Sequence, residues 1–329
     1  MMKTILFSLV LAFFAWAWSG CSKKSGPAAE PPEKQIIGTD ATNDSIALKL
    51  VWLPGKHYSF RTERVIGTDL TLPGSLGTQT VVIALSLDFS LSVRAPSKDG
   101  VQELDLEIAA MKFFFQQNEQ YHFFFDSRQS VAEDAVDPSC PLLRYLLNAP
   151  FTCFVAEDGT LLRTKGLDAV AAKLKGGNSQ LTSILQSVLN EKNLELMYGG
   201  LNASLPDAPV KMGDSWHVNS EIDPYGANSL ILDGHNTFTN WEMFDGRQCV
   251  HAEYQGNFSA NAGEPDGSGP IEIQGGTCSS EGWIDPQLGM GIRSSSVAHL
   301  KGKFTVMGQT LPAQIDMTSN FRLLSVKDQ

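Results

Sequence analysis

The sequence predicts an α+β protein that is mainly β. We expect two tandem antiparallel curved sheets or half-barrels, related by a degenerate duplication, with a central helical segment. Three observations predict this architecture. Apolar or alternating runs are separated by turn residues, two stretches match in the order of their elements, and a segment between them has apolar residues at helical spacing. Hydrophobic residues make up 42% of the chain, enough to build a core.

The N-terminus predicts export. Residues 1–20 join a short basic start to the apolar run TILFSLVLAFFAWAW, which is typical of a signal peptide. Cys21 follows Ser-Gly and resembles the end of a bacterial lipobox, although Trp18 stands where that motif prefers an aliphatic residue. We therefore expect Cys21 to be lipidated and to anchor the chain in a lipid bilayer; the alternative is an ordinary signal peptide cleaved near Cys21. Residues 21–45 then form a polar, flexible tether.

Residues 46–166 form the predicted first β unit. Strand-like runs at 81–95 and 102–115 flank a Ser-Lys-Asp-Gly turn, and residues 151–166 form a hairpin that turns at Asp158-Gly159. Two Phe triplets, symmetric about Glu119, predict a further hairpin with aromatic rings on both faces. One interpretation is a strand buried between a sheet and a helix. The other is a cavity or docking surface for an apolar ligand, with contacts from Met111, Phe113, Phe115, Tyr121, Phe123 and Phe125.

Helical patterns interrupt the strands at two places. A short helical insertion is expected near 130–149, and a helical connection over 167–207. Residues 208–329 then form the second β unit, which includes a hairpin turning at Asp245-Gly246. The stretch PGKHYSFRTE lies near the start of the first unit and aligns with MGDSWHVNSE near the start of the second. This alignment is the main indication of duplication.

The cysteines predict disulfides. Four cysteines follow Cys21, and an even number in an exported protein is typical of disulfide bonds. If the polar loop between Cys249 and Cys278 joins two antiparallel strands at its centre, these two residues face each other. We expect the pairs Cys140–Cys153 and Cys249–Cys278; the alternative is four buried thiols.

Motifs for catalysis are weak. Asp214, Ser215 and His217 have the residue types of a hydrolytic triad, but the residues that follow alternate like a strand, so we expect turn and rim residues and no catalytic site. The six histidines show no metal-ligand spacing, and no phosphate-binding or dinucleotide motif is present, so no metal or cofactor is expected. The net charge of −11 argues against nucleic-acid binding.

Several segments together resemble a known family. These are the lipobox-like leader, LVWLPGKHYSF, FVAEDGTLLRTKGLDAV, LPDAPVKMGDSWHV and GWIDPQLGMGIRSS. They resemble an uncharacterised family of exported bacterial lipoproteins, a domain of unknown function, and the resemblance implies export and a β-rich fold. We expect a non-enzymatic, membrane-tethered module in the bacterial cell envelope, facing the periplasm or the cell surface. It would bind or carry an apolar ligand or an envelope partner; a structural or scaffolding lipoprotein is the alternative, and a hydrolase is a third.

Overall fold

The fold comes from a computed structural model. It describes residues 35–36, 44–73, 77–97, 99–131, 140–156, 159–174, 204–222, 230–260, 271–306 and 309–329. The predicted signal peptide, Cys21, the loop at 261–270 and the helical pattern over 181–189 lie outside these residues.

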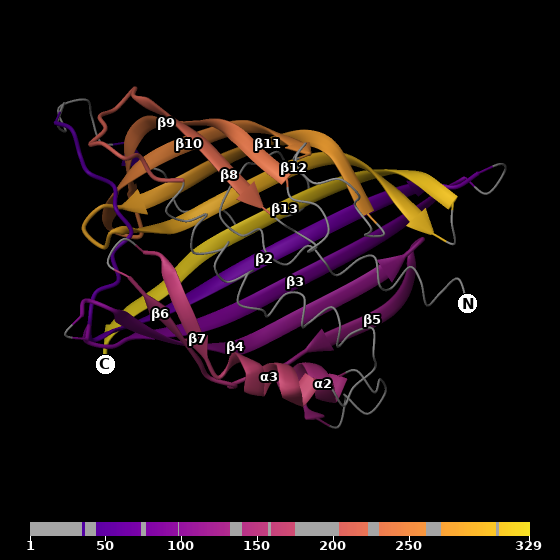
Figure 1. Ribbon diagram of the computed structural model, residues 1–329, viewed down its shortest axis with the longest axis horizontal. Helices are drawn as coiled ribbons and strands as arrows, with labels where there is room; N and C mark the ends of the chain where they lie inside the picture. The colour runs from indigo at the N-terminus through magenta and orange to yellow at the C-terminus, as the bar shows by residue number, and fades with distance from the viewer. Residues whose placement is uncertain are drawn as a thin grey trace.

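The described part of the chain is a single large antiparallel sheet (Figure 1). Its elements in chain order are β1 (Gln35–Ile36), β2 (Lys56–Thr71), β3 (Thr78–Val93), β4 (Gln102–Gln117), β5 (Gln120–Asp126), α2 (Cys140–Arg144), β6 (Phe151–Val155), β7 (Leu161–Lys165), α3 (Leu167–Leu174), β8 (Ser215–Ile222), β9 (Leu230–Phe244), β10 (Arg247–Ala260), β11 (Ile271–Asp285), β12 (Met290–Val306) and β13 (Gln309–Asp328). The 13 strands follow the order β1-β9-β10-β11-β12-β13-β2-β3-β4-β6-β7, with β5 beside β4 and β8 beside β9.

The prediction of two tandem sheets is wrong, while the mainly β content is confirmed. The C-terminal strand β13 pairs with β12 along one edge and with β2 along the other, so the two expected units share one ladder. Strand composition does not reveal this pairing, because any amphipathic strand can offer hydrogen bonds on both edges. The helices α2 and α3 lie together at the margin of the sheet near β4 (Figure 1), not as a layer between two sheets.

The predicted hairpins around Glu119 and at Asp245-Gly246 are confirmed. Strands β6 and β7 also pair as expected, while Asp158 of the turn between them lies outside the described residues. The β4–β5 turn places Asn118 and Glu119 at φ 48° and 60°, and the β9–β10 turn places Asp245 and Gly246 at φ 48° and 75°. Two successive residues of positive φ form a tight turn whose twist matches that of the flanking strands. Phe113 therefore faces Phe125 across the β4–β5 ladder.

One face of the sheet is buried and the other is exposed along most strands. In β13, buried and exposed residues alternate strictly from Leu311 to Leu323, as expected when successive side chains point to opposite faces. The sheet is strongly curved, and β9 to β12 bend over toward its inner side (Figure 1). The buried set forms the lining of the curved sheet, which we call the concave face.

Candidate functional site: the concave face of the sheet

The concave face carries one apolar surface that runs across β2 to β5 and β8 to β13. We call it the main apolar cluster; it includes Ile66, Leu85, Phe113, Phe258, Leu300 and Ile315, each no more than 9% exposed. A second cluster lies toward the start of β2 and includes Tyr58, Phe60, Leu104, Cys153, Trp283 and Phe321. Side chains from both expected units thus contribute to one continuous surface.

The Phe triplets fall as the alternation predicts. Phe113, Phe115, Phe123 and Phe125 are buried in the main apolar cluster together with Met111, while Phe124 is 38% exposed on the opposite face. Tyr121 belongs to β5, and its side chain lies outside what the structure describes. Helix α2 adds Cys140 and Leu143 to the same cluster, and the guanidinium of Arg144 lies 5.4 Å from the centre of the Phe125 ring.

A line of polar side chains crosses the concave face from strand to strand. The ladder registers align them directly opposite one another on six neighbouring strands, and each is 9% exposed or less. We call this line the transverse polar row; it consists of Asn236, Tyr254, Ser280, Ser296, Ser319 and Arg64. Buried polar groups are stabilised when they are hydrogen-bonded and are costly when they are not.

Hydrogen bonding within the row is uneven. Ser296 Oγ donates to the carbonyl of Ser319 at 3.1 Å, and Asn236 Nδ2 donates to the carbonyl of Ser204 at 2.9 Å. The hydroxyls of Tyr254 and Ser319 are buried without a hydrogen-bond partner among the described residues. Burial lowers the pKa of Arg64 to about 9, so its guanidinium remains mostly charged at neutral pH.

Two glycines leave room for the Tyr254 side chain. A Cβ added to Gly256 would lie 2.0 Å from the Tyr254 hydroxyl oxygen, and one added to Gly234 would lie 2.6 Å from it. The phenol therefore lies flat over the backbone of β9 and β10, where other residue types would collide with it. Burial raises the pKa of Tyr254, so its hydroxyl stays protonated and can donate a hydrogen bond.

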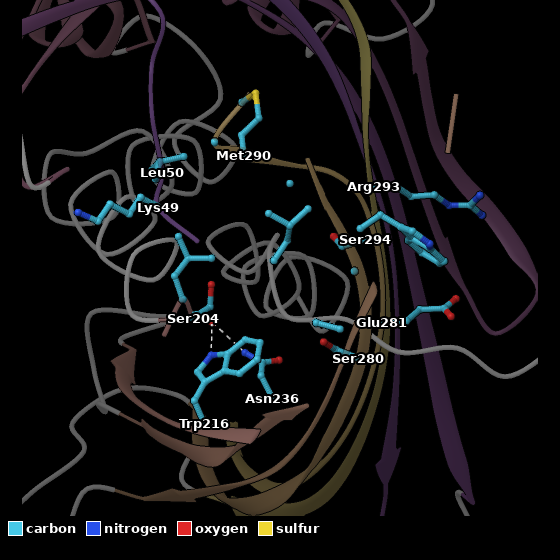
Figure 2. Close-up of a pocket in the computed structure, with 17 residues that line it drawn as sticks. Lys49, Leu50, Ser204, Trp216, Asn236, Ser280, Glu281, Met290, Arg293 and Ser294 are labelled. Carbon is cyan, nitrogen blue, oxygen red and sulfur yellow. Dashed lines mark hydrogen bonds between the residues drawn. The ribbon is translucent and has the colours of Figure 1, made fainter. Parts of the chain in front are cut away.

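A small cavity opens at one end of the row (Figure 2). Its volume is about 80 Å³. Asn236 and Ser280 from the row line it, together with Trp216, Ser204 and Met290. Both the Trp216 indole and the Asn236 amide donate to the Ser204 carbonyl, each at 2.9 Å. The cavity is far smaller than the roughly 300–1,000 Å³ that drug-sized ligands occupy, so such a ligand does not fit it unless the surrounding residues move apart.

The structure does not bring Asp214, Ser215 and His217 together. Asp214 accepts the backbone N–H of Lys211 in the turn before β8, and the Ser215 hydroxyl lies 2.8 Å from that of Thr237. His217 Nε2 lies 2.5 Å from Asp233 Oδ1 on the neighbouring strand. Each side chain thus has its own cross-strand or turn partner.

The predicted disulfides are not formed, and Cys140, Cys153, Cys249 and Cys278 are all buried. In the β10–β11 ladder Cys278 lies opposite Gly256, seven positions along β10 from Cys249. Seven residues of strand correspond to about 24 Å, far beyond the roughly 7 Å limit between the Cα atoms of a disulfide. The prediction failed because it centred the hairpin midway between the cysteines. Cys140 and Cys153 lie in different clusters.

The described residues include neither a metal-binding cluster nor a membrane-spanning helix. No group of three or more His, Cys, Asp or Glu side chains is arranged to hold a metal ion. The described helices are too short and too polar for any of them to span a bilayer.

Comparison with known proteins gives a family match for part of the chain. Residues 99–244 match a family of unknown function, DUF6263. This match covers less than half of the chain and agrees with the expected resemblance to an uncharacterised family. No curated protein sequence matches the chain.

Solved structures show only distant similarity. A structure of lipid–protein interactions in lipovitellin has 10% identity and a TM-score of 0.41, with 84% of this chain and 26% of that chain covered. This chain thus spans about a quarter of lipovitellin. DynF of the dynemicin pathway of Micromonospora chersina has 8% identity and a TM-score of 0.23, covering 90% and 92%. A DUF1329 family protein from Desulfovibrio piger has 10% identity and a TM-score of 0.13, covering 82% and 85%. At these scores the similarities support no argument about function.

Sequence reasoning missed the transverse polar row. A signal was present, because Ser319 interrupts the apolar positions of β13 and Arg64 interrupts those of β2. The alignment of these exceptions into one row depends on the register of five ladders, which local sequence does not encode.

Proposed function

We propose that this protein is an exported lipoprotein that binds an apolar ligand on the concave face of its sheet. The observation that carries the proposal is the main apolar cluster, which extends over both halves of the sheet as one surface. Among the described helices, α2 contributes to this cluster, beside β4 and β5, and α3 packs in the second cluster. A curved sheet with a continuous apolar lining is suited to enclosing a hydrocarbon chain.

Ligand binding in this proposal includes an opening of the concave face, because the cavity of about 80 Å³ is too small for an acyl chain. The apolar contacts to the ligand come from the inward-facing residues of β2 to β5, among them Phe113, Phe115, Phe123 and Phe125. Binding is favourable because each Å² of apolar ligand surface removed from water contributes roughly 25 cal/mol of free energy.

Native mass spectrometry of the mature protein, purified from a bacterial envelope, tests the proposal. We expect an apolar ligand to copurify, or added palmitate or its methyl ester to bind. The variant Ala313→Phe places a bulky ring on the concave face and should lower the bound fraction, whereas Gln314→Phe places the same ring on the exposed face and should not. Circular dichroism and thermal melting confirm that both variants fold. If no lipid copurifies and no added lipid binds, the proposal is rejected. Equal amounts of bound lipid in both variants would show that the ligand does not bind at this part of the concave face.

Membrane tethering through Cys21 is part of the same proposal. It is supported by the lipobox-like leader and the polar segment that follows. Wild-type protein should fractionate with membranes and incorporate labelled palmitate, and Cys21→Ser should release it into the soluble envelope fraction. Membrane association that persists in the serine variant would contradict the acyl anchor.

A second candidate is a scaffolding role through a sheet edge. Strand β7 ends the order of strands, and Leu162 on it is 52% exposed. An exposed edge strand can pair with an extended segment of another protein. A photo-crosslinking residue at Leu162 in cells should then capture an envelope protein, and the same residue at Gln314 should not. If neither position captures a partner, this role is excluded.

A further inference from the structure

We infer that residues 46–53 form a strap that closes one end of the concave face and opens to admit the ligand. The strap precedes β2 and contributes Lys49 and Leu50 to the lining of the small cavity. Figure 2 shows Leu50 on one side of this cavity, with Ser280 and Ser294 across from it. This role rests on the proposed function and gives the ligand a route into the curved sheet.

Two buried side chains hold the strap in place. Leu48 is 2% exposed and packs in one cluster with Trp241 of β9, whereas Trp52 is 7% exposed and belongs to the second cluster. Between these two residues Val51 is 42% exposed, and Leu50 is only partly buried. The middle of the strap is therefore held mainly by its two ends.

Few hydrogen bonds join the strap to the rest of the described chain. Ile46 exchanges two backbone hydrogen bonds with Val210, at 2.7 and 2.9 Å, but Val210 lies in the connection before β8. The N–H of Val51 donates to the carbonyl of Gly289 at 2.8 Å. Two side chains also bond to backbone atoms of the strap, those of Gln102 and Tyr58. Segments with few backbone hydrogen bonds and few buried contacts open locally at a lower free energy than the paired strands of a sheet.

Two buried indole N–H groups add a cost to the closed strap. Trp52 Nε1 and Trp241 Nε1 are both buried without a hydrogen-bond partner among the described residues. Trp52 belongs to the strap, and Trp241 packs in the same cluster as Leu48. A buried donor without a partner carries the full cost of leaving water. Opening of the strap removes part of this cost, because water then reaches the indoles.

The strap lies between solvent and the apolar lining of the sheet. Trp216 lines the cavity and also packs against the main apolar cluster. On the other side the strap fits closely against the turn between β11 and β12, since a Cβ added to Gly289 would lie 2.7 Å from the Cβ of Val51. Movement of the strap away from this turn opens the cavity and gives an apolar tail access to Trp216 and the cluster beyond it.

A reversible disulfide tests this movement. Ile46 and Val210 form an antiparallel pair that exchanges both backbone hydrogen bonds, and the Cα atoms of such a pair lie about 5.5 Å apart. A disulfide spans this distance. The double variant Ile46→Cys/Val210→Cys should therefore hold the strap closed when oxidised and release it when reduced. The matched control is Lys301→Cys/Gln314→Cys, which places a disulfide between exposed, directly opposite positions of β12 and β13.

Uptake of added palmitate by the mature protein, followed over time by native mass spectrometry, gives the readout. The oxidised strap variant should take up palmitate at least roughly tenfold more slowly than the same protein after reduction, because a closed strap blocks entry. The control variant should take up palmitate at the wild-type rate in both states. Circular dichroism and thermal melting confirm that both variants fold.

Hydrogen exchange of the ligand-free wild type measures opening without any lipid. The amides of Ile46 and Val51 should exchange roughly a hundredfold faster than those of β13, which pairs along both of its edges. Leu48→Ala weakens one end of the strap and should speed both this exchange and the uptake of palmitate. Leu324→Ala removes a side chain that is 44% exposed and should change neither.

The outcomes separate the strap from the proposed function. Equal rates of uptake by the oxidised and reduced strap variant would overturn the strap as the entrance and leave the apolar site standing. Strap amides that exchange as slowly as those of β13, or an oxidised control that is slowed as much as the oxidised strap variant, would also overturn it. If palmitate binds to neither the wild type nor any variant, the proposed function fails and the entrance fails with it.

Discussion

Replacing Phe125 by alanine should destabilise the protein far more than the same change at its neighbour Phe124. Phe125 is 1% exposed in the main apolar cluster, lies opposite Phe113 and lies under the Arg144 guanidinium. Phe124 is 38% exposed on the other face of the same strand. The two substitutions remove the same atoms from adjacent positions, so they compare burial directly.

The magnitude follows from burial and from the cavity left behind. A buried Phe→Ala change costs about 3–5 kcal/mol, and loss of the contact with Arg144 adds roughly 0.5–1 kcal/mol. Phe124→Ala creates no enclosed cavity and should cost about 1 kcal/mol. At roughly 2–4 °C per kcal/mol for a large domain, the melting temperature should fall by about 7–24 °C for Phe125→Ala and by about 2–4 °C for Phe124→Ala.

Thermal melting by circular dichroism, repeated in urea, measures both losses on the mature protein. Phe125→Leu retains most of the apolar volume and should recover most of the stability. An equal or larger loss for Phe124→Ala would refute the assignment of alternate Phe residues to opposite faces, and with it the concave face itself.

Three more predictions concern packing, thiols and acid stability. Gly256→Ala should lower the melting temperature because its methyl group displaces the Tyr254 ring. The double variant that also carries Tyr254→Ala should lose less stability than the sum of the two single variants. Additive losses would contradict the contact between the two residues. Ellman titration of the denatured mature protein should find four reactive thiols, and two or fewer would indicate disulfides. In the native protein Cys249 should resist alkylation at pH 8, because burial raises its pKa to about 12. Burial would raise the pKa of Asp88, but hydrogen bonds from Arg61 and Arg128 outweigh it and lower the pKa overall. This stabilisation is present above the ordinary carboxyl pKa and is lost as pH falls below it, so Asp88→Asn should flatten the loss of melting temperature between about pH 5 and pH 2; an unchanged slope would contradict the pairing.

The strands and turns were accessible from sequence because their signals are local. Asp245-Gly246 and the residues around Glu119 dictate tight turns, and the alternating pattern from Leu311 to Leu323 assigns one face to the interior. The Phe triplets likewise placed aromatic rings on both faces. These features depend on residues within a few positions of one another.

The cysteines show where such reasoning stopped. Their pairing was inferred from a symmetric loop, but the β10–β11 register shifts Cys278 by seven positions away from Cys249. Register is selected by the summed packing of a whole strand and by the length of the connection. A single pair of residues cannot reveal it.

By itself, the sequence determined that this protein is built from long amphipathic strands with tight turns and that it has a net charge of −11. The tertiary structure alone decided that these strands form one sheet, because β13 pairs with both β12 and β2. It also decided that Arg64 and Ser319, separated by most of the chain, lie side by side in one polar row. Hydrogen-bonded ladders join residues according to strand order and register, and these are set by the free energy of burying the whole concave face.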